Sequence, residues 1–447
     1  MAGAHTWLTI LVTVAAVALP SAVYAQKTWQ ANRFVGSVGI NIHLHFNETL
    51  YRENFPLVKS RLIELGVRHV RDGLVDAIDW PTYYDRLNEL GAAGIKCTLI
   101  VHPEDETALW LDYPSRVPEC FHAYEGPNEF DLNRQGLPNW AEILRDTVIR
   151  LSAIRDVPGL DQYDVYGPTV ITKKAYNQLG DISPYIDVAN THHYFAGRNP
   201  ETRGWGPHGY GSMSFNLKLV DHYSVPLPIV TTEAGYRDDP NAEKGRPSGP
   251  GSIDAVPPDI AGIYMTRTLL AKFLAGYQRT FLYELADYWR SGSFGLLDET
   301  GAPKPAFTAV KNLLNLLSDP GPQFSPTPLE YTIDDAPGSL YDMAFQKRDG
   351  RYYLALWLGV ESWDPITTEY SYPTWRRVTV NLPETMQVRV YRWQRDGSMT
   401  VSPNAAVVST VPLDVTDKLT IVEVTPQVAE TASRFEPFLC ALLGCEP

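Results

Sequence analysis

The sequence predicts a (β/α)8 barrel followed by a C-terminal antiparallel β-sandwich, and three observations support this α/β architecture. Between about residues 38 and 317, short apolar segments alternate with amphipathic ones, which is the pattern of a parallel sheet with crossover helices. The apolar segments number eight, as a closed barrel of this type requires. Beyond about residue 329 the pattern changes to period-two alternation broken by turn signals, which is typical of antiparallel strands.

The eight expected barrel strands share an apolar run that ends near polar residues. They cover residues 38–46, 67–73, 95–102, 121–126, 163–168, 187–194, 228–235 and 279–287. Amphipathic segments such as 55–66, 83–94 and 141–154 lie between them and are expected to form the covering helices. The connections after the sixth and seventh strands are long and rich in Gly, Pro and Arg. Because such loops usually shape the cleft of a barrel enzyme, we expect these two to do so.

The boundary between the two domains is expected in the segment "SDPGPQFSPTP", which is dense in Pro and Gly. After it, "YLALWLG", "RRVTVNL", "QVRVYRW" and "LTIVEVT" show the alternation of half-buried strands. The predicted organisation is a signal peptide over 1–25, a catalytic barrel over 26–320, a β-sandwich over 321–430 and a tail over 431–447.

The amino-terminal segment and the cysteines indicate an oxidising compartment. The first 25 residues contain no Asp, Glu, Lys or Arg and end in "VYA", which predicts a secretory signal peptide cleaved after Ala25, with an uncleaved anchor as the alternative. The chain has four cysteines, and we expect the disulfides Cys97–Cys120 and Cys440–Cys445. The expected location is secreted or extracellular, with the periplasm as the alternative. A formal net charge of -14 argues against nucleic acid or an anionic membrane as partner.

Polar residues stand at the ends of the expected strands, where barrel enzymes carry their chemistry. Asn128 and Glu129 follow the fourth strand, and Thr232 and Glu233 end the seventh. Strands four and seven face each other across the barrel mouth. Glycoside hydrolysis needs such a facing pair of carboxyl groups, which stand ~5 to 5.5 Å apart in retaining enzymes.

Several motifs together resemble the clan A glycoside hydrolases, retaining barrel enzymes with an Asn-Glu pair on strand four and a nucleophilic Glu on strand seven. The matching segments are "GPNEFD", "THHYF", "TTEAGY", "VRHVRDG" and "FGLLDETGAPKPAFTAVKNLL". Within the clan, the chain is similar to the heparanase and β-glucuronidase family, to family 39 and to family 5.

The resemblance implies roles for individual residues. Glu129 would be the general acid and then the general base, with a pKa raised while Glu233 is ionised. Glu233 would be the nucleophile, and Asn128 would donate a hydrogen bond to the 2-hydroxyl of the sugar. Arg71 and Tyr194 would hydrogen-bond Glu233 and keep it ionised. The full set of expected substrate-binding residues is Asn128, Arg71, His192, Tyr194, Trp289, His43 and His45, with Tyr288 as the alternative to Trp289 for stacking on the sugar.

Two other classes of function remain open from the sequence. His43 and His45 share one face of the first strand and, with His102, His192 or His193, and Asp287, offer ligands for the zinc of an amidohydrolase-type barrel. A non-catalytic glycan-binding protein is the third possibility. For Glu125 we expect a structural role, as one of the strand carboxylates, Glu284 among them, that pair with inward arginines.

The interpretation favoured by the sequence is a secreted retaining glycoside hydrolase. It would cleave β-type bonds of a poly- or oligosaccharide with Glu129 and Glu233. We expect it to act as a monomer, without a metal or other cofactor and without a nucleic-acid or membrane partner.

Overall fold

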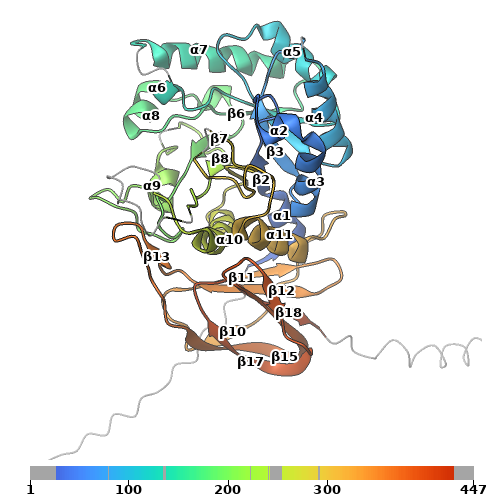
Figure 1. Cartoon of the computed structure of the whole chain (residues 1–447), viewed down its shortest axis with the longest axis vertical. Helices are drawn as coiled ribbons and strands as arrows, with labels where there is room; N and C mark the ends of the chain where they lie inside the picture. The colour runs from blue at the N-terminus through green and yellow to red at the C-terminus, as the bar shows by residue number, and fades with distance from the viewer. Residues whose placement is uncertain are drawn as a thin grey trace, which may run out of the picture.

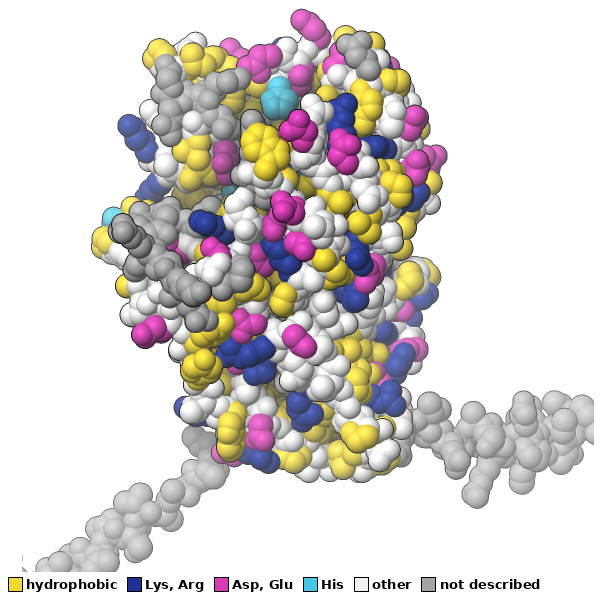
Figure 2. All heavy atoms as spheres, in the orientation of Figure 1, with side chains coloured by type: hydrophobic (Ala, Val, Ile, Leu, Met, Phe, Trp, Pro, Cys, Tyr) yellow, Lys and Arg dark blue, Asp and Glu magenta, His cyan; other side chains and the backbone are white. Residues whose placement is uncertain are grey.

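The structure is a computed structural model that describes residues 27–426, apart from 79, 134–136, 222, 240, 242–253 and 290–291. The expected signal peptide and the expected Cys440–Cys445 disulfide lie outside the described residues. Within the described part of the chain, no helix has the length and apolar character needed to cross a membrane. The face shown in Figure 2 carries acidic and basic side chains interspersed among apolar ones.

Eight parallel strands form a closed barrel in the amino-terminal part of the chain. They are β2 (Val38–Asn41), β3 (His69–Gly73), β4 (Lys96–Ile100), β5 (Phe121–Glu125), β6 (Asp164–Tyr166), β7 (Ala189–His192), β8 (Ile229–Ala234) and β9 (Arg279–Leu282). Their order in the sheet is β6-β5-β4-β3-β2-β9-β8-β7, and a parallel bridge between Tyr166 and Val188 closes the ring. The predicted (β/α)8 barrel is confirmed, and each strand lies within its predicted segment.

Helices surround the barrel, as Figure 1 shows. They are α1 (Ala31–Gly36), α2 (Leu50–Glu53), α3 (Phe55–Leu65), α4 (Thr82–Ala92), α5 (Thr107–Arg116), α6 (Phe130–Asn133), α7 (Trp140–Ser152), α8 (Lys173–Leu179), α9 (Met213–Lys218), α10 (Pro258–Leu274) and α11 (Pro305–Leu317). Helix α3 illustrates the local rules. Asn54 caps its first turn by accepting a hydrogen bond from the backbone N–H of Leu57, and Gly66 ends it in the left-handed region at φ 82°.

A disulfide joins two neighbouring barrel strands. Cys97 lies in β4, and Cys120 immediately precedes β5, 23 residues further along the chain. This pairing confirms one of the two expected disulfides. Both cysteines are fully buried, so the bond lies inside the layer between the barrel and its helices.

The second domain is a β-sandwich built largely from antiparallel strands. Its strands are β10 (Thr332–Asp334), β11 (Leu340–Gln346), β12 (Tyr352–Leu358), β15 (Arg376–Trp393), β16 (Met399–Val401), β17 (Ala406–Val415) and β18 (Thr420–Thr425), with the hairpin β13 (Trp363–Asp364) and β14 (Glu369–Tyr370) beside them. Strand β15 is 18 residues long, and its register with β17 shifts between Asn381 and Met386. Because its first half pairs with β10 and its second half with β18, this strand belongs to both layers. An apolar core that includes Leu354, Val380 and Val422 lies between them.

One strand of this second sheet comes from the opposite end of the chain. Strand β1 (Thr28–Gln30) pairs in parallel with β11, with Thr28 opposite Ala344. The sequence analysis placed these residues in the barrel segment, because three residues are too few to show a periodicity. The division at residue 320 stays a prediction, and β1 is an exception to it.

A buried ion pair joins the two domains along α10. Arg267 is fully buried and bonds Glu201, and it also donates to the backbone carbonyls of Val360 and Asp417 in the sandwich. The indole N–H of Trp357 donates to Glu201 at 2.7 Å. The sandwich therefore packs against the barrel on the side of α10 and α11, as Figure 1 shows.

Candidate active site

A cleft of about 500 Å³ opens at the carboxyl ends of the barrel strands. Polar side chains from β2, β3 and β8 line it together with residues of the following loops. Aromatic rings at its wall include Phe46, Tyr283 and Tyr288. Convergent polar side chains beside aromatic rings suit a site that binds a polar small molecule.

Glu233, in β8, is held by two hydrogen-bond donors from different strands. Nη1 of Arg71 lies 2.7 Å from its Oε1, and the hydroxyl of Tyr194 donates to its Oε2 at 2.8 Å. Both hydrogen bonds were expected from the sequence. Burial, followed by the charge of Glu233, raises the pKa of Tyr194 well above its usual value, so the phenol stays protonated as a donor.

Arg71, in β3, is the hub of the polar floor. Its Nε and Nη2 bind Glu125 in a bidentate pair, both at 2.8 Å, and Nη1 also donates to Asn41. Its Nη2 further donates to Asn128 Oδ1 at 2.5 Å. Burial lowers the pKa of Arg71, but the charges of Glu125 and Glu233 outweigh it and raise the pKa, so the guanidinium stays charged. The expected structural pairing of Glu125 with an inward arginine is present.

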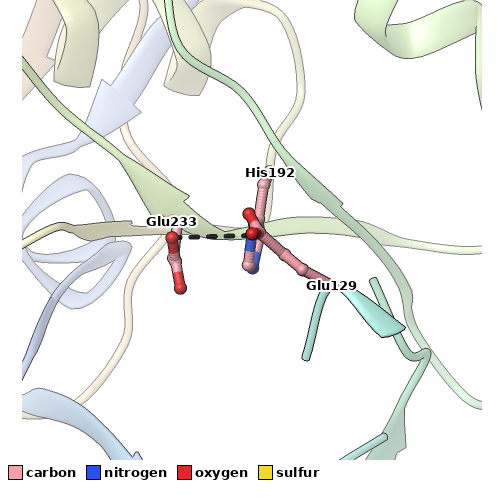
Figure 3. A group of neighbouring side chains, drawn as sticks. All are labelled: Glu129, His192 and Glu233. Atoms are coloured by element: carbon pink, nitrogen blue, oxygen red, sulfur yellow. Dashed lines mark hydrogen bonds and ion pairs between the residues drawn. The ribbon is translucent and has the colours of Figure 1, made fainter. Parts of the chain in front are cut away.

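Glu129 follows β5, and its side chain points toward His192 and Glu233 (Figure 3). Its backbone lies in the left-handed region at φ 43°, and its N–H donates to the hydroxyl of Thr169. A non-glycine residue in this region is strained and persists only where its surroundings hold it. A carboxylate oxygen of Glu129 lies within 4.8 Å of one of Glu233, with His192 between them.

The pKa of Glu129 departs from the sequence-based expectation. Burial raises this pKa, but the hydrogen bond from His192, its charge and the charge of Arg71 outweigh burial and lower the pKa. The expected raised pKa is therefore wrong. The reason is that Nδ1 of His192 lies 2.8 Å from Glu129 Oε1, a contact that strand periodicity cannot show.

Behind His192 lies a polar network that the sequence analysis did not assign. Nε2 of His192 lies 3.1 Å from the hydroxyl of Thr232, which lies 2.9 Å from Glu125 Oε1. Asn190 Nδ2 donates to the same hydroxyl at 2.9 Å. Thr232 and Asn190 are completely buried. The polar runs in "NTHHY" and "TTEAG" could have indicated this network. A buried parallel strand usually consists of apolar residues, so polar residues inside one indicate a polar contact.

The two histidines of the first strand face separate carboxylates. His43 Nε2 lies 2.9 Å from Glu284 Oε2, and His45 Nδ1 lies 3.1 Å from Asp72 Oδ1. Both histidines line the cleft, as expected for contacts with a substrate. Glu284 thus faces a histidine, where the sequence analysis expected an arginine.

In the described part of the chain, the side chains that could jointly hold a metal ion are Glu129, His192 and Glu233. His43, His45, His102 and Asp287 do not join this group. A cation there would compete with Arg71, whose positive charge already lies 2.7 Å from Glu233. The donor set fits a hydrogen-bonded carboxylate pair better than a metal centre. His193, the other candidate ligand, instead contacts Lys272 Nζ at 3.0 Å and the carbonyl of Gly211 at 3.1 Å.

The two aromatic candidates after the eighth strand lie at different depths. Tyr288 lines the cleft itself. Trp289 is 62% exposed and lines an adjoining hollow with His45 and Phe46. Tyr288 is therefore placed to contact a molecule bound in the cleft, and Trp289 a molecule bound in the adjoining hollow.

Comparison with known proteins supports the fold. No protein-family model and no curated protein sequence matches the chain. Among solved structures, a family 39 glycoside hydrolase from Bacteroides cellulosilyticus is 15% identical with a TM-score of 0.55, over 89% of this chain and 82% of that one. A GH51 alpha-L-arabinofuranosidase from Thermotoga petrophila is 11% identical with a TM-score of 0.56, over 89% of this chain and 97% of that one. The catalytic domain of GH30 xylanase C from Talaromyces cellulolyticus is 11% identical with a TM-score of 0.53, over 90% of this chain and 98% of that one. At these identities the likeness shows a shared architecture of barrel and β-domain.

Proposed function

We propose that this protein is a retaining glycoside hydrolase of clan A that cleaves β-type bonds of a poly- or oligosaccharide. The observation that carries the proposal is the pair Glu129 and Glu233, whose carboxylate oxygens lie within 4.8 Å of one another. This spacing suits a mechanism in which one carboxyl group attacks the sugar directly, because an inverting enzyme needs roughly 6.5 to 9.5 Å to hold a water between them. The proteins of similar fold named above are glycoside hydrolases, which agrees with this assignment.

In the first half of the reaction, Glu233 attacks the anomeric carbon. Its carboxylate is oriented by Arg71 and Tyr194, which each donate to one of the two oxygens. Glu129 gives a proton to the glycosidic oxygen as the bond between that oxygen and the anomeric carbon breaks. The product is a sugar esterified to Glu233 and a free alcohol.

In the second half, Glu129 acts as the base. It takes a proton from a water molecule whose oxygen bonds to the anomeric carbon, and the ester bond to Glu233 breaks. Asn128 is held by Arg71 at the floor of the cleft, and its amide N–H₂ would donate to the 2-hydroxyl of the sugar. The transition state has oxocarbenium character, and this hydrogen bond is stronger in that state than in the product. The first 25 residues predict that the protein is exported, which agrees with an extracellular saccharide as the substrate.

Azide rescue tests the proposed roles. In the Glu233→Ala variant, we expect hydrolysis of an aryl β-glycoside to be abolished, because the nucleophile is gone. In Glu129→Ala, external azide should restore turnover on an activated aryl glycoside, because the azide attacks the glycosyl ester without needing a base. Glu119→Ala, a change at an exposed glutamate, is the matched control. Undiminished turnover of Glu129→Ala on an unactivated glycan would exclude the assignment.

A chelator distinguishes the carboxylate mechanism from the metal-dependent alternative. The purified protein is screened with and without chelator against aryl β-glycosides and plant or bacterial polysaccharides. We expect sugar release to resist the chelator, because the proposed chemistry uses only side chains. Loss of all activity with chelator would favour a metal held by the histidines of the cleft.

A further inference from the structure

The environment of the Thr232 hydroxyl determines which nitrogen of His192 carries a proton. A threonine hydroxyl has one hydrogen to donate and two lone pairs to accept with. Its nearest acceptors are Glu125 Oε1 at 2.9 Å and Asn190 Oδ1 at 3.0 Å, and a carboxylate is the stronger of the two. Once the hydroxyl hydrogen points to Glu125, only lone pairs of this oxygen can face His192 Nε2 at 3.1 Å, so this nitrogen must be the donor.

The orientation of the Asn190 amide supports this direction of donation. Its Nδ2 contacts Glu125 Oε1 at 3.1 Å and the carbonyl of Gly167 at 3.2 Å, both of which can only accept. Its Oδ1 accepts from the backbone N–H of Thr232 at 3.2 Å. If the hydroxyl instead donated to His192, the carboxylate of Glu125 would face an oxygen lone pair at 2.9 Å, which is unfavourable in a completely buried site.

We propose that Thr232 fixes His192 in the state protonated at Nε2, so that a single transferable proton is held between Nδ1 and Glu129. A ring with hydrogen at Nε2 has, when neutral, a lone pair at Nδ1. The 2.8 Å contact between Nδ1 and Glu129 Oε1 then needs one proton, either on the nitrogen or on the carboxyl group. Thr232 and Glu125 are positioning residues that act through His192. This inference deepens the proposed function and rests on it for its chemical consequence.

Several charged or titratable groups face this pair from the surrounding elements. They are Glu233 in β8, Arg71 in β3, Glu125 in β5 and Tyr194 after β7. Arg71 is bound to both Glu125 and Glu233, so these three groups form one ion-paired cluster beside the pair. The hydrogen bond from His192 and the charges of His192 and Arg71 together outweigh burial and lower the pKa of Glu129.

The shared proton supplies the acid of the first step. When a glycoside binds, the proton passes from Nδ1 to Glu129 and then to the leaving oxygen, as the glycosidic bond breaks and Glu233 bonds to the anomeric carbon. In the second step, water gives its proton to Glu129 and its oxygen to the anomeric carbon, and the ester bond breaks. The proton then returns to Nδ1, so one cycle consumes one water and leaves the pair unchanged.

Nuclear magnetic resonance of histidine nitrogens tests the tautomer without any substrate. The protein is labelled with ¹⁵N-histidine, and the His192→Asn variant assigns the signals of His192. We expect Nε2 of the wild type to be protonated throughout about pH 5 to 8. In Thr232→Val the buried Nε2–H loses its acceptor, so the neutral ring should move its hydrogen to Nδ1. A wild-type ring with an unprotonated Nε2 would overturn the proposal, whether or not the protein cleaves glycosides.

The pH profile of kcat/KM tests the chemical consequence. The probe is the phenyl β-D-glycoside of the sugar that the wild type cleaves, because a poor leaving group needs the acid. In Thr232→Val the hydrogen of the neutral His192 ring lies at Nδ1, where it can donate to an ionised Glu129. The pair therefore loses its transferable proton at a lower pH than in the wild type. The alkaline limb of Thr232→Val should therefore move down by about one pH unit. Thr232→Ser should restore the wild-type profile, because it keeps the hydroxyl.

A matched control separates this effect from general damage to the barrel. Thr98 in β4 is also completely buried, and among the described residues its hydroxyl has no hydrogen-bond partner. Thr98→Val should leave the pH profile and the His192 signals unchanged. A Thr232→Val protein with lower kcat but an unmoved alkaline limb and unmoved nitrogen signals would overturn the proposal. If Thr232→Val does not fold, the wild-type spectrum and Thr232→Ser still decide the tautomer.

Discussion

The Nη1 atom of Arg71 lies 2.7 Å from Oε1 of Glu233. The same guanidinium binds Glu125 with its Nε and Nη2 atoms, so one buried cation serves two buried carboxylates. A planar group with five donors can satisfy both at once, whereas an ammonium group cannot.

Replacement of Arg71 should separate charge from geometry. Arg71→Met leaves Glu125 and Glu233 buried without a counter-charge, and we expect it to lower the free energy of unfolding by about 3 to 5 kcal/mol. Arg71→Lys should keep most of this stability and still lose at least about a hundredfold in kcat/KM, because it cannot hold both carboxylates. Urea unfolding and steady-state kinetics on both variants measure the two effects. Wild-type kinetics in Arg71→Lys would show that the fork geometry is unimportant.

Tyr194→Phe should weaken the nucleophile selectively. The change removes a hydrogen bond to a charged group, which is worth about 1.5 to 3 kcal/mol, so kcat/KM should fall roughly 10- to 100-fold. Tyr236→Phe is the matched control, because that buried phenol donates to the backbone carbonyl of Arg198. Wild-type kcat/KM in Tyr194→Phe would contradict the role of Tyr194.

The barrel should lose stability in acid through two histidines at the amino-terminal ends of its strands. Burial, followed by the charge of Arg279, lowers the pKa of His122 to about 4 and that of His69 well below its usual value. Because the unfolded chain then binds more protons than the folded one, stability is lost as the pH falls from about 6.5 towards 4. His122 alone accounts for about 2 to 3 kcal/mol by pH 4.5.

The variant His122→Gln tests this pH dependence. Glutamine is uncharged and can still accept a hydrogen bond from Arg279, which lies 3.1 Å from His122 Nε2. Urea unfolding at pH 7 and pH 4.5 should show a smaller loss in the variant than in the wild type. Equal losses in the two proteins would assign the acid sensitivity to other groups.

The cleft should prefer neutral sugars to uronides. Among the described residues that line it, Arg71 is the only Lys or Arg, and its donors are already engaged. Asp72 and Glu233 also line the cleft, so a sugar carboxylate would be repelled there. We expect 4-nitrophenyl β-D-glucoside or galactoside to exceed the matching uronide at least about a hundredfold in kcat/KM. Faster cleavage of the uronides would require a cation that this part of the structure does not provide.

The contact between the domains should contribute to the stability of both. Arg267→Met leaves Glu201 buried beside Trp357, and we expect a loss of about 3 to 5 kcal/mol in the free energy of unfolding. The double variant with Glu201→Gln should recover part of this loss, because no uncompensated charge remains. Calorimetry of the wild type and both variants measures the change. Three proteins with the same melting temperature would show that the ion pair contributes nothing.

Sequence patterns were sufficient for much of the barrel and for part of the site. Polar residues at the ends of apolar strands placed Glu129 and Glu233 across the mouth, because parallel strands end at one face. Periodicity reports the face of a strand on which a residue lies, but not the residue that it meets across the barrel. The contact of His192 with Thr232 depends on a register irregularity after Thr191, which the sequence does not show. The pKa of Glu129 depends on the contact of His192 with Glu129, which the sequence does not show either, so its direction was predicted wrongly.

The pairing of β1 with β11 also constrains the order in which this protein is completed. Residues 28–30 are synthesised before every barrel strand, yet their partner strand emerges more than 300 residues later. The sandwich therefore cannot reach its full width by folding alone as a late, independent unit, and β1 must wait beside a finished barrel. A barrel expressed alone as residues 26–320 would contain β1 without its partner strand. A sandwich expressed alone would have an unpaired edge at β11. Transfer of the complete sandwich to another protein would need both β1 and the C-terminal segment. The two domains are therefore expected to be gained or lost together in evolution.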